Sequence, residues 1–66
     1  MRGILAKQER LRARGKATLR VTKGHPLFLY NGNSFTILAM GSPGVKCRIT
    51  LQIRDKPVQV SIDDVF

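Results

Sequence analysis

Residues 46–54 alternate polar and apolar side chains without interruption, in the order "KCRITLQIR". Because successive side chains of a strand point to opposite faces, this alternation predicts a half-buried β-strand. The side chains expected to point into the core are those of Cys47, Ile49, Leu51 and Ile53. A chain containing such a strand must supply further strands to pair with it and an apolar layer to cover it.

The outward side of this strand carries three cations, Lys46, Arg48 and Arg54. Two interpretations remain open, because a cationic row is either an ordinary solvated strand face or a surface that binds anions. The whole chain has 12 Lys and Arg against 4 Asp and Glu, a formal net charge of +8 on 66 residues. Such a charge attracts polyanions, and nucleic acid binding is favoured because each neutralised phosphate releases counterions.

Residues 1–16 form the most basic segment of the chain. Good helix formers fill residues 4–14, and Gly15 follows where a helix would end. The apolar stripe of Ile4, Leu5, Gln8 and Leu11 is narrow, so the helix is expected to be frayed or disordered unless it docks. The segment is a solubilising tail or an arm that tracks phosphates, and a membrane-surface helix is disfavoured because it has no Trp or Phe.

From Ala17 onward the pattern changes to a period of two, which predicts a small all-β domain over residues 17–66. The predicted strands cover 17–22, 27–30, 34–40, 46–54 and 58–62. Phe35, Ile37 and Ala39 should point inward from the third. Short connections rich in Gly, Pro and Asn favour antiparallel neighbours. We therefore expect a mainly β fold: a five-stranded antiparallel meander or barrel-like sheet, with the N-terminal basic helix or disordered arm as an appendage.

The size of the chain predicts a homodimer. A domain of 66 residues buries too small a fraction of its surface to be comfortably stable alone. The single Cys47 cannot form an intramolecular disulfide, and together with His25 it is too sparse a set for a zinc site. We interpret Cys47 as a core residue and expect no cofactor.

The sequence gives little support for catalysis or for membrane insertion. His25 is the only histidine, and no nucleophile or carboxylate has a spacing that would partner it, so we interpret it as a turn residue. Asp63 and Asp64 are interpreted as a solvated chain end. No apolar stretch approaches the ~20 residues of a membrane span, and no leader-like apolar region begins the chain. We expect a cytoplasmic protein that is not an enzyme.

The run from Gly24 to Phe66 resembles the carbon storage regulator proteins of bacteria, and the resemblance extends over the β domain, residues 17–66. It is carried by the turn glycines of 41–44, by Arg48-Ile49, and by the last strand leading into Asp63-Asp64. The resemblance implies an intertwined homodimer of five-stranded chains that binds Gly-Gly-Ala sequences in messenger leaders and blocks ribosome access. The sequence departs from the family in having Val21-Thr22-Lys23 where the family has paired arginines, and Ile62 at an RNA-binding arginine.

Two functions follow from these patterns. The first is a small nucleic-acid-binding regulator of translation, with RNA favoured over DNA because no helix-turn-helix pattern is present. Phe28 and Tyr30 could stack on bases, although a core position is expected for Phe28. The second is a protein-interaction module that docks its basic surface on an acidic protein. The residues predicted to bind nucleic acid are Arg2, Lys7, Arg10, Arg12, Arg14, Lys16, Arg20, Lys46, Arg48 and Arg54.

Overall fold

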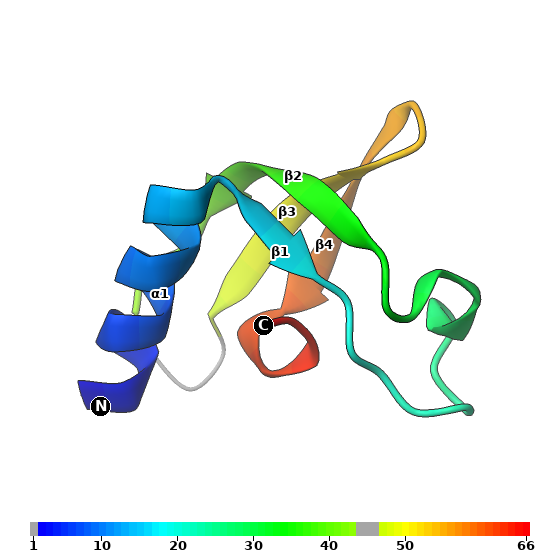
Figure 1. Ribbon diagram of the computed structural model, residues 1–66, viewed down its shortest axis with the longest axis horizontal. Coiled ribbons are helices and arrows are strands. Elements are labelled where there is room, and N and C mark those ends of the chain that lie inside the picture. The colour runs from blue at the N-terminus through cyan, green and yellow to red at the C-terminus, as the bar shows by residue number, and fades with distance from the viewer. Residues whose placement is uncertain (1, 44–46) are drawn as a thin grey trace.

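The computed structural model describes residues 2–43 and 47–66, which form one helix and one antiparallel sheet of four strands in the order β1-β2-β3-β4 (Figure 1). The elements in chain order are α1 (Arg2–Arg14), β1 (Lys16–Thr18), the 3₁₀ turn η1 (Phe28–Tyr30), β2 (Ser34–Met40), β3 (Arg48–Ile53), β4 (Lys56–Ser61) and the 3₁₀ turn η2 (Ile62–Asp64). The predicted mainly β class, the antiparallel pairing and the N-terminal helix are confirmed. The described residues form four named strands, so five are not confirmed.

Helix α1 ends where the sequence predicts. Gly15 has a φ of 76°, a left-handed conformation that glycine adopts without steric cost, and its N–H donates to Leu11 O over 2.7 Å. Two basic residues, Arg12 and Arg14, lie in the last turn, where positive charge interacts favourably with the helix dipole. The chain can therefore leave the helix and enter β1 within two residues.

The helix is docked on the sheet through Gln8 and Leu11, both of which are fully buried. The Gln8 side-chain amide donates to Gly41 O over 2.9 Å and to Cys47 Sγ over 3.1 Å. Figure 1 shows α1 standing beside one end of the sheet. The N-terminal segment is thus a helix docked on the body of the protein, which is one of the alternatives that the sequence left open.

The core prediction for β3 is confirmed, since all four inward residues are buried. The buried apolar residues of the described chain are Leu11, Ala17, Leu19, Cys47, Ile49, Leu51, Ile53, Val60, Ile62 and Val65. The extent of the strand is corrected at its end: Arg54 has a φ of 57° and lies with Asp55 in the turn that leads to β4. Ile53 and Lys56 are the last paired residues of this hairpin.

Strand β2 contains a bulge that the alternation could not indicate. Its register against β3 shifts between Ile37 and Ala39, so one additional residue lies on the β2 side. After the bulge, each side chain of β2 points to the face of the sheet opposite to the one that the alternation predicts. Ala39 is exposed and Met40 is half-buried, and the prediction that Ala39 points inward is wrong.

Residues 27–30 were predicted as a strand, and the structure shows a 3₁₀ turn there instead. Tyr30 N–H donates to Leu27 O over 2.9 Å, and Asn31 N–H donates to Phe28 O over 3.0 Å. These local i to i−3 bonds satisfy the backbone groups that a strand would have paired with a neighbour. A four-residue apolar run is too short for its pattern to distinguish the two conformations.

The predicted first strand is shorter than expected, because β1 ends at Thr18. Beyond it the chain still pairs with the C-terminal segment 64–66, through a bridge between Leu19 and Val65. Thr18 and Phe66 exchange two backbone hydrogen bonds of 2.8 and 2.9 Å, and Arg20 N–H donates to Asp64 O over 2.7 Å. The end of the described chain is therefore held against β1.

The sheet core generates a stability prediction. Replacing the fully buried Leu51 with Ala should lower the free energy of unfolding by ~2–5 kcal/mol, because the change leaves a cavity in the apolar core beneath the sheet. The matched control is Leu38→Ala at a side chain that is 50% exposed, which should cost under about 1 kcal/mol. Urea titrations of both variants measure the difference, and equal losses would contradict the assigned core.

Candidate nucleic-acid interface

One flank of α1 carries three of the predicted cationic residues, Lys7, Arg10 and Arg14. They are spaced i, i+3 and i+7, so they lie on the same side of the helix. The neighbouring face, with Gln8 and Leu11, is packed on the body of the protein. Docking through that face fixes the direction in which the cationic flank points.

Phe66 joins this flank to a fourth cation. Arg14 Nη2 donates to Phe66 O over 2.5 Å, and Arg14 Nε donates to Lys16 O over 3.1 Å. The Arg20 guanidinium carbon lies 4.8 Å from the centroid of the Phe66 ring, which is within the range of a cation–π contact. We refer to Lys7, Arg10, Arg14 and Arg20 together as the helix-flank cluster.

Lys7 is half-buried, and its ionisation responds to the cluster around it. Loss of solvent through burial lowers the pKa of Lys7 below its ordinary value of 10.5, and Arg10 and Arg20 lower it further. The carboxylates of Asp63 and Asp64 act in the opposite direction and raise this pKa without restoring it. The ammonium group of Lys7 therefore lies in a setting that an additional anion would stabilise.

The two acidic residues next to the cluster are more structured than the sequence suggested. His25 Nδ1 accepts a hydrogen bond of 3.0 Å from Leu27 N–H, so in the neutral ring Nε2 carries the hydrogen. That nitrogen lies 3.4 Å from Asp64 Oδ2. His25 thus links the loop before η1 to the chain end, and Asp64 is half-buried rather than simply solvated. Asp63 is exposed, and its N–H donates to Ser61 Oγ over 3.2 Å.

The other predicted binding residues lie apart from the cluster. Arg12 is exposed on a different side of α1, and Lys16 is exposed at the start of β1. Arg48 and Arg54 lie at opposite ends of β3, roughly 20 Å apart for a strand of this length. Figure 1 shows the β3–β4 turn, which contains Arg54, at the far end of the sheet from α1.

Two members of the predicted set fall outside the described part of the structure. Lys46 lies outside the described residues, and so does the side chain of Arg2. Of the three cations predicted to lie along one strand at 46–54, only Arg48 lies within β3 in the described residues, because Arg54 is in the following turn.

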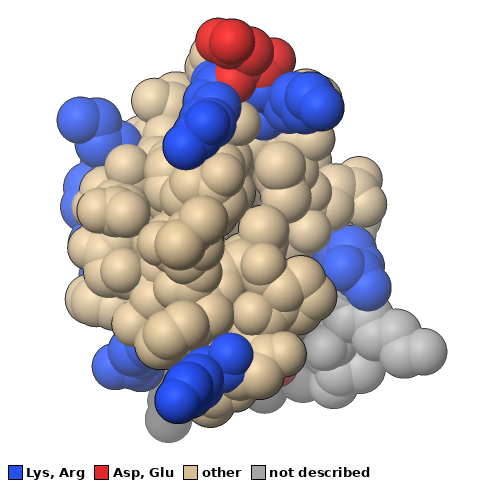
Figure 2. All heavy atoms as spheres, turned by 90° about the vertical axis from the view of Figure 1, so that its right-hand side faces the viewer, with Lys and Arg blue, Asp and Glu red and all other residues tan. Residues whose placement is uncertain are grey.

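The side of the molecule that carries η1 and the β3–β4 turn has a different character. Figure 2 shows this side, where Lys and Arg lie around the margin and uncharged residues occupy the middle. The exposed apolar side chains include those of Leu29, which is 82% exposed, and Phe28, which is 41% exposed. The expectation that Phe28 is a core residue is wrong, because the 3₁₀ turn presents its side chain to solvent.

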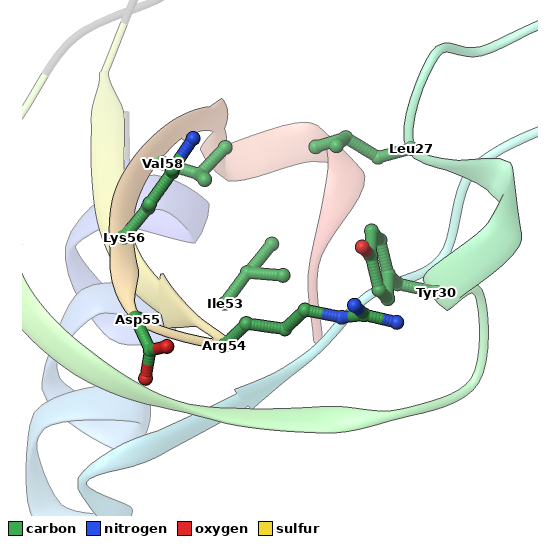
Figure 3. A pocket seen from close by; sticks show the side chains of 7 residues that line it. All are labelled: Leu27, Tyr30, Ile53, Arg54, Asp55, Lys56 and Val58. Atoms are coloured by element: carbon green, nitrogen blue, oxygen red, sulfur yellow. The ribbon is translucent and has the colours of Figure 1, made fainter.

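A pocket of about 410 Å³ opens between η1 and the β3–β4 turn (Figure 3). It is lined by Leu27, Tyr30, Ile53, Arg54, Asp55, Lys56 and Val58. The Arg54 guanidinium carbon lies 6.0 Å from the centroid of the Tyr30 ring. The sequence contained no sign of this pocket, because the predicted strand at 27–30 would have placed its lining residues elsewhere.

No protein-family model, curated protein or solved structure matches this chain. The resemblance to the carbon storage regulator family consequently stays a prediction. Among residues 2–43 and 47–66, no three His, Cys, Asp or Glu side chains gather closely enough to hold a metal ion. No helix in the same described residues is long and apolar enough to cross a membrane.

The lowered pKa of Lys7 predicts a pH dependence of stability. Between that lowered pKa and 10.5, the unfolded chain binds more protons at this site than the folded chain, so the free energy of unfolding rises with pH. Lys7→Met keeps the side-chain stem but cannot titrate. The stability of wild type relative to Lys7→Met should increase as the pH is raised from neutral toward 10.5, in urea titrations at each pH. A difference that is independent of pH would contradict the burial of the ammonium group.

Proposed function

We propose that this protein is a small nucleic-acid-binding regulator that acts on single-stranded RNA in the cytoplasm. The observation that carries the proposal is the helix-flank cluster: Arg14 and Arg20 both contact Phe66, and Lys7 lies close enough to Arg10 and Arg20 for their charges to lower its pKa. These cations outnumber the two nearby carboxylates. A phosphate backbone is the polyanion that such a local excess of positive charge attracts.

Preorganisation strengthens this proposal. A cationic side chain on a disordered arm loses conformational freedom when it binds, whereas α1 is already docked through Gln8 and Leu11. The Arg14 guanidinium is held by two backbone carbonyls, and that of Arg20 stacks on Phe66. A phosphate approaching Lys7 would also offset the repulsion that Arg10 and Arg20 exert on its ammonium group.

RNA is favoured over DNA by the shape of the described residues. Their one α-helix packs on the sheet beside a single antiparallel layer, and no second helix forms a helix-turn-helix with it. Exposed loops and strand faces are typical of domains that bind unpaired RNA. A chain this small would regulate translation by occupying a site on the messenger.

We further infer that the sheet closes into a five-stranded, barrel-like arrangement. The support is the Leu19–Val65 bridge together with the hydrogen bonds that join Thr18 to Phe66 and Arg20 to Asp64. In this arrangement the segment after η2 acts as a short fifth strand beside β1. Closure of this kind would protect an otherwise open sheet edge.

A homodimer is part of the proposal, since the core of a 66-residue domain is small. Sedimentation at several protein concentrations should give the mass of two chains, with a melting temperature that rises with concentration. A monomer mass and a melting temperature that does not change with concentration would contradict the dimer. The RNA-binding proposal does not depend on this result.

Two arginines of α1 provide a matched test of the interface. Arg10 belongs to the helix-flank cluster, whereas Arg12 is exposed on another side of the same helix. Binding of a fluorescein-labelled, random-sequence RNA is followed by anisotropy over a range of salt concentrations. Arg10→Gln should flatten the log–log salt slope by about 0.7, the value for one contact to a single strand, and Arg12→Gln should change it less.

The same titration distinguishes the alternatives. Equal slopes for Arg10→Gln and Arg12→Gln would show that RNA responds to the overall charge of the protein and does not bind preferentially at the helix-flank cluster. Absence of wild-type binding at low salt would overturn the RNA proposal and favour docking on an acidic protein.

A further inference from the structure

We infer that the pocket between η1 and the β3–β4 turn holds one base of a bound single-stranded RNA, with the adjoining phosphate at Arg54. This inference rests on the proposed function and adds a subsite to it. The subsite is distinct from the helix-flank cluster, because the β3–β4 turn lies at the opposite end of the sheet from α1 (Figure 1). The subsite includes Arg54, which the alternating pattern had grouped with Lys46 and Arg48 along one strand.

The walls of the pocket suit a flat, largely apolar group. Ile53 projects from the end of β3, and Leu27 and Val58 close the pocket from either side (Figure 3). Its volume of about 410 Å³ falls within the range of small-molecule pockets, which is ~300–1,000 Å³. An aromatic base fits such a space without requiring an unpaired polar side chain deep inside.

Tyr30 provides an aromatic face that is already fixed in position. Its ring packs against Phe35 with an interplanar angle of 84° and a centroid distance of 6.0 Å, an edge-to-face contact. The backbone of Tyr30 is held in η1 by its hydrogen bond to Leu27 O. A ring held in this way can stack on a base at little cost in conformational entropy.

The rim of the pocket supplies the positive charge. Arg54 extends along one side of the pocket until its guanidinium reaches the Tyr30 ring, whereas the Lys56 side chain extends away from that guanidinium on the other side (Figure 3). The Asp55 carboxylate points away from that guanidinium in the same view. An apolar cavity with a cation beside its aromatic ring is complementary to a ligand that joins an aromatic body to an anion, and a nucleotide has both.

The backbone of Arg54 gives an independent indication of function. It is the first residue of a two-residue hairpin loop and has a φ of 57°, a conformation in which glycine, asparagine or aspartate is preferred. A long side chain at this position costs stability that glycine would not cost. Strained positions of this kind cluster at ligand sites, and here the strained residue is the one whose guanidinium lies over the pocket's aromatic ring.

The first experiment uses the sequence itself as a probe, because Tyr30 is the only tyrosine. Its ring resonances in the full chain are followed by NMR while unlabelled single-stranded RNA is added at low salt. Stacking of a base should shift these resonances in parallel with the anisotropy of the labelled RNA. Tyr30→Leu keeps an apolar wall without an aromatic face and should weaken RNA binding about fivefold or more.

The second experiment separates function from stability. Arg54→Gly should weaken RNA binding and flatten the salt slope by about 0.7, while the melting temperature stays unchanged or rises because the strain is relieved. The matched control is Lys23→Gly, which removes the same charge from an exposed turn outside the pocket. The control should retain more of the wild-type affinity than Arg54→Gly.

The outcomes distinguish this inference from the function on which it rests. RNA binding by anisotropy without any change at Tyr30, and with equal affinities for Arg54→Gly and Lys23→Gly, would overturn the pocket and leave the helix-flank interface in place. No RNA binding in any assay would overturn both. A shift of the Tyr30 resonances by an acidic peptide but not by RNA would assign the pocket to a protein partner and overturn the inference.

Discussion

The buried amide of Gln8 is the contact on which the arrangement of this molecule depends. A polar group with so little exposure is tolerated only when its hydrogen bonds are made, and here Gly41 O and Cys47 Sγ accept them. A helix of 13 residues is marginal alone, so packing of Leu11 and pairing of Gln8 are what make α1 persist. The backbone is close-packed at Gly41, since a Cβ there would lie 3.2 Å from Arg48 O. The spacing of the helix-flank cluster follows from this docking.

Residues 64–66 complete the helix-flank cluster that the docked helix begins. Pairing of residues 64–66 with residues 18–20 brings Phe66 beside α1, where it accepts a hydrogen bond from Arg14 and stacks under Arg20. The same pairing brings Asp63 and Asp64 near Lys7, which limits the local excess of positive charge. The surface is therefore a compact cluster from distant parts of the sequence rather than a uniform coat of cations.

The sequence was sufficient to predict the structure where local side-chain patterns determine it. Unbroken alternation predicted the buried residues of β3, and Gly15 marked the end of α1 because its backbone conformation favours glycine. Prediction failed where a long-range contact or a local deviation intervened. The β2 bulge exposed Ala39, local i to i−3 hydrogen bonds made residues 27–30 a 3₁₀ turn, and the Arg54 turn ended β3 early. The spacing of Lys7, Arg10 and Arg14 places them on one flank of α1, but the addition of Arg20 through Phe66 depends on tertiary pairing that no spacing encodes.

Amide hydrogen exchange of the full chain without nucleic acid tests most directly whether the basic surface is preformed. If α1 is docked as described, the backbone amides around Gln8 and Leu11 should exchange far more slowly than unstructured amides, with protection approaching that of β3. Exchange of the α1 amides at unstructured rates while β3 remains protected would contradict the account. The basic segment would then be a disordered arm, and the helix-flank cluster would not exist before a partner binds.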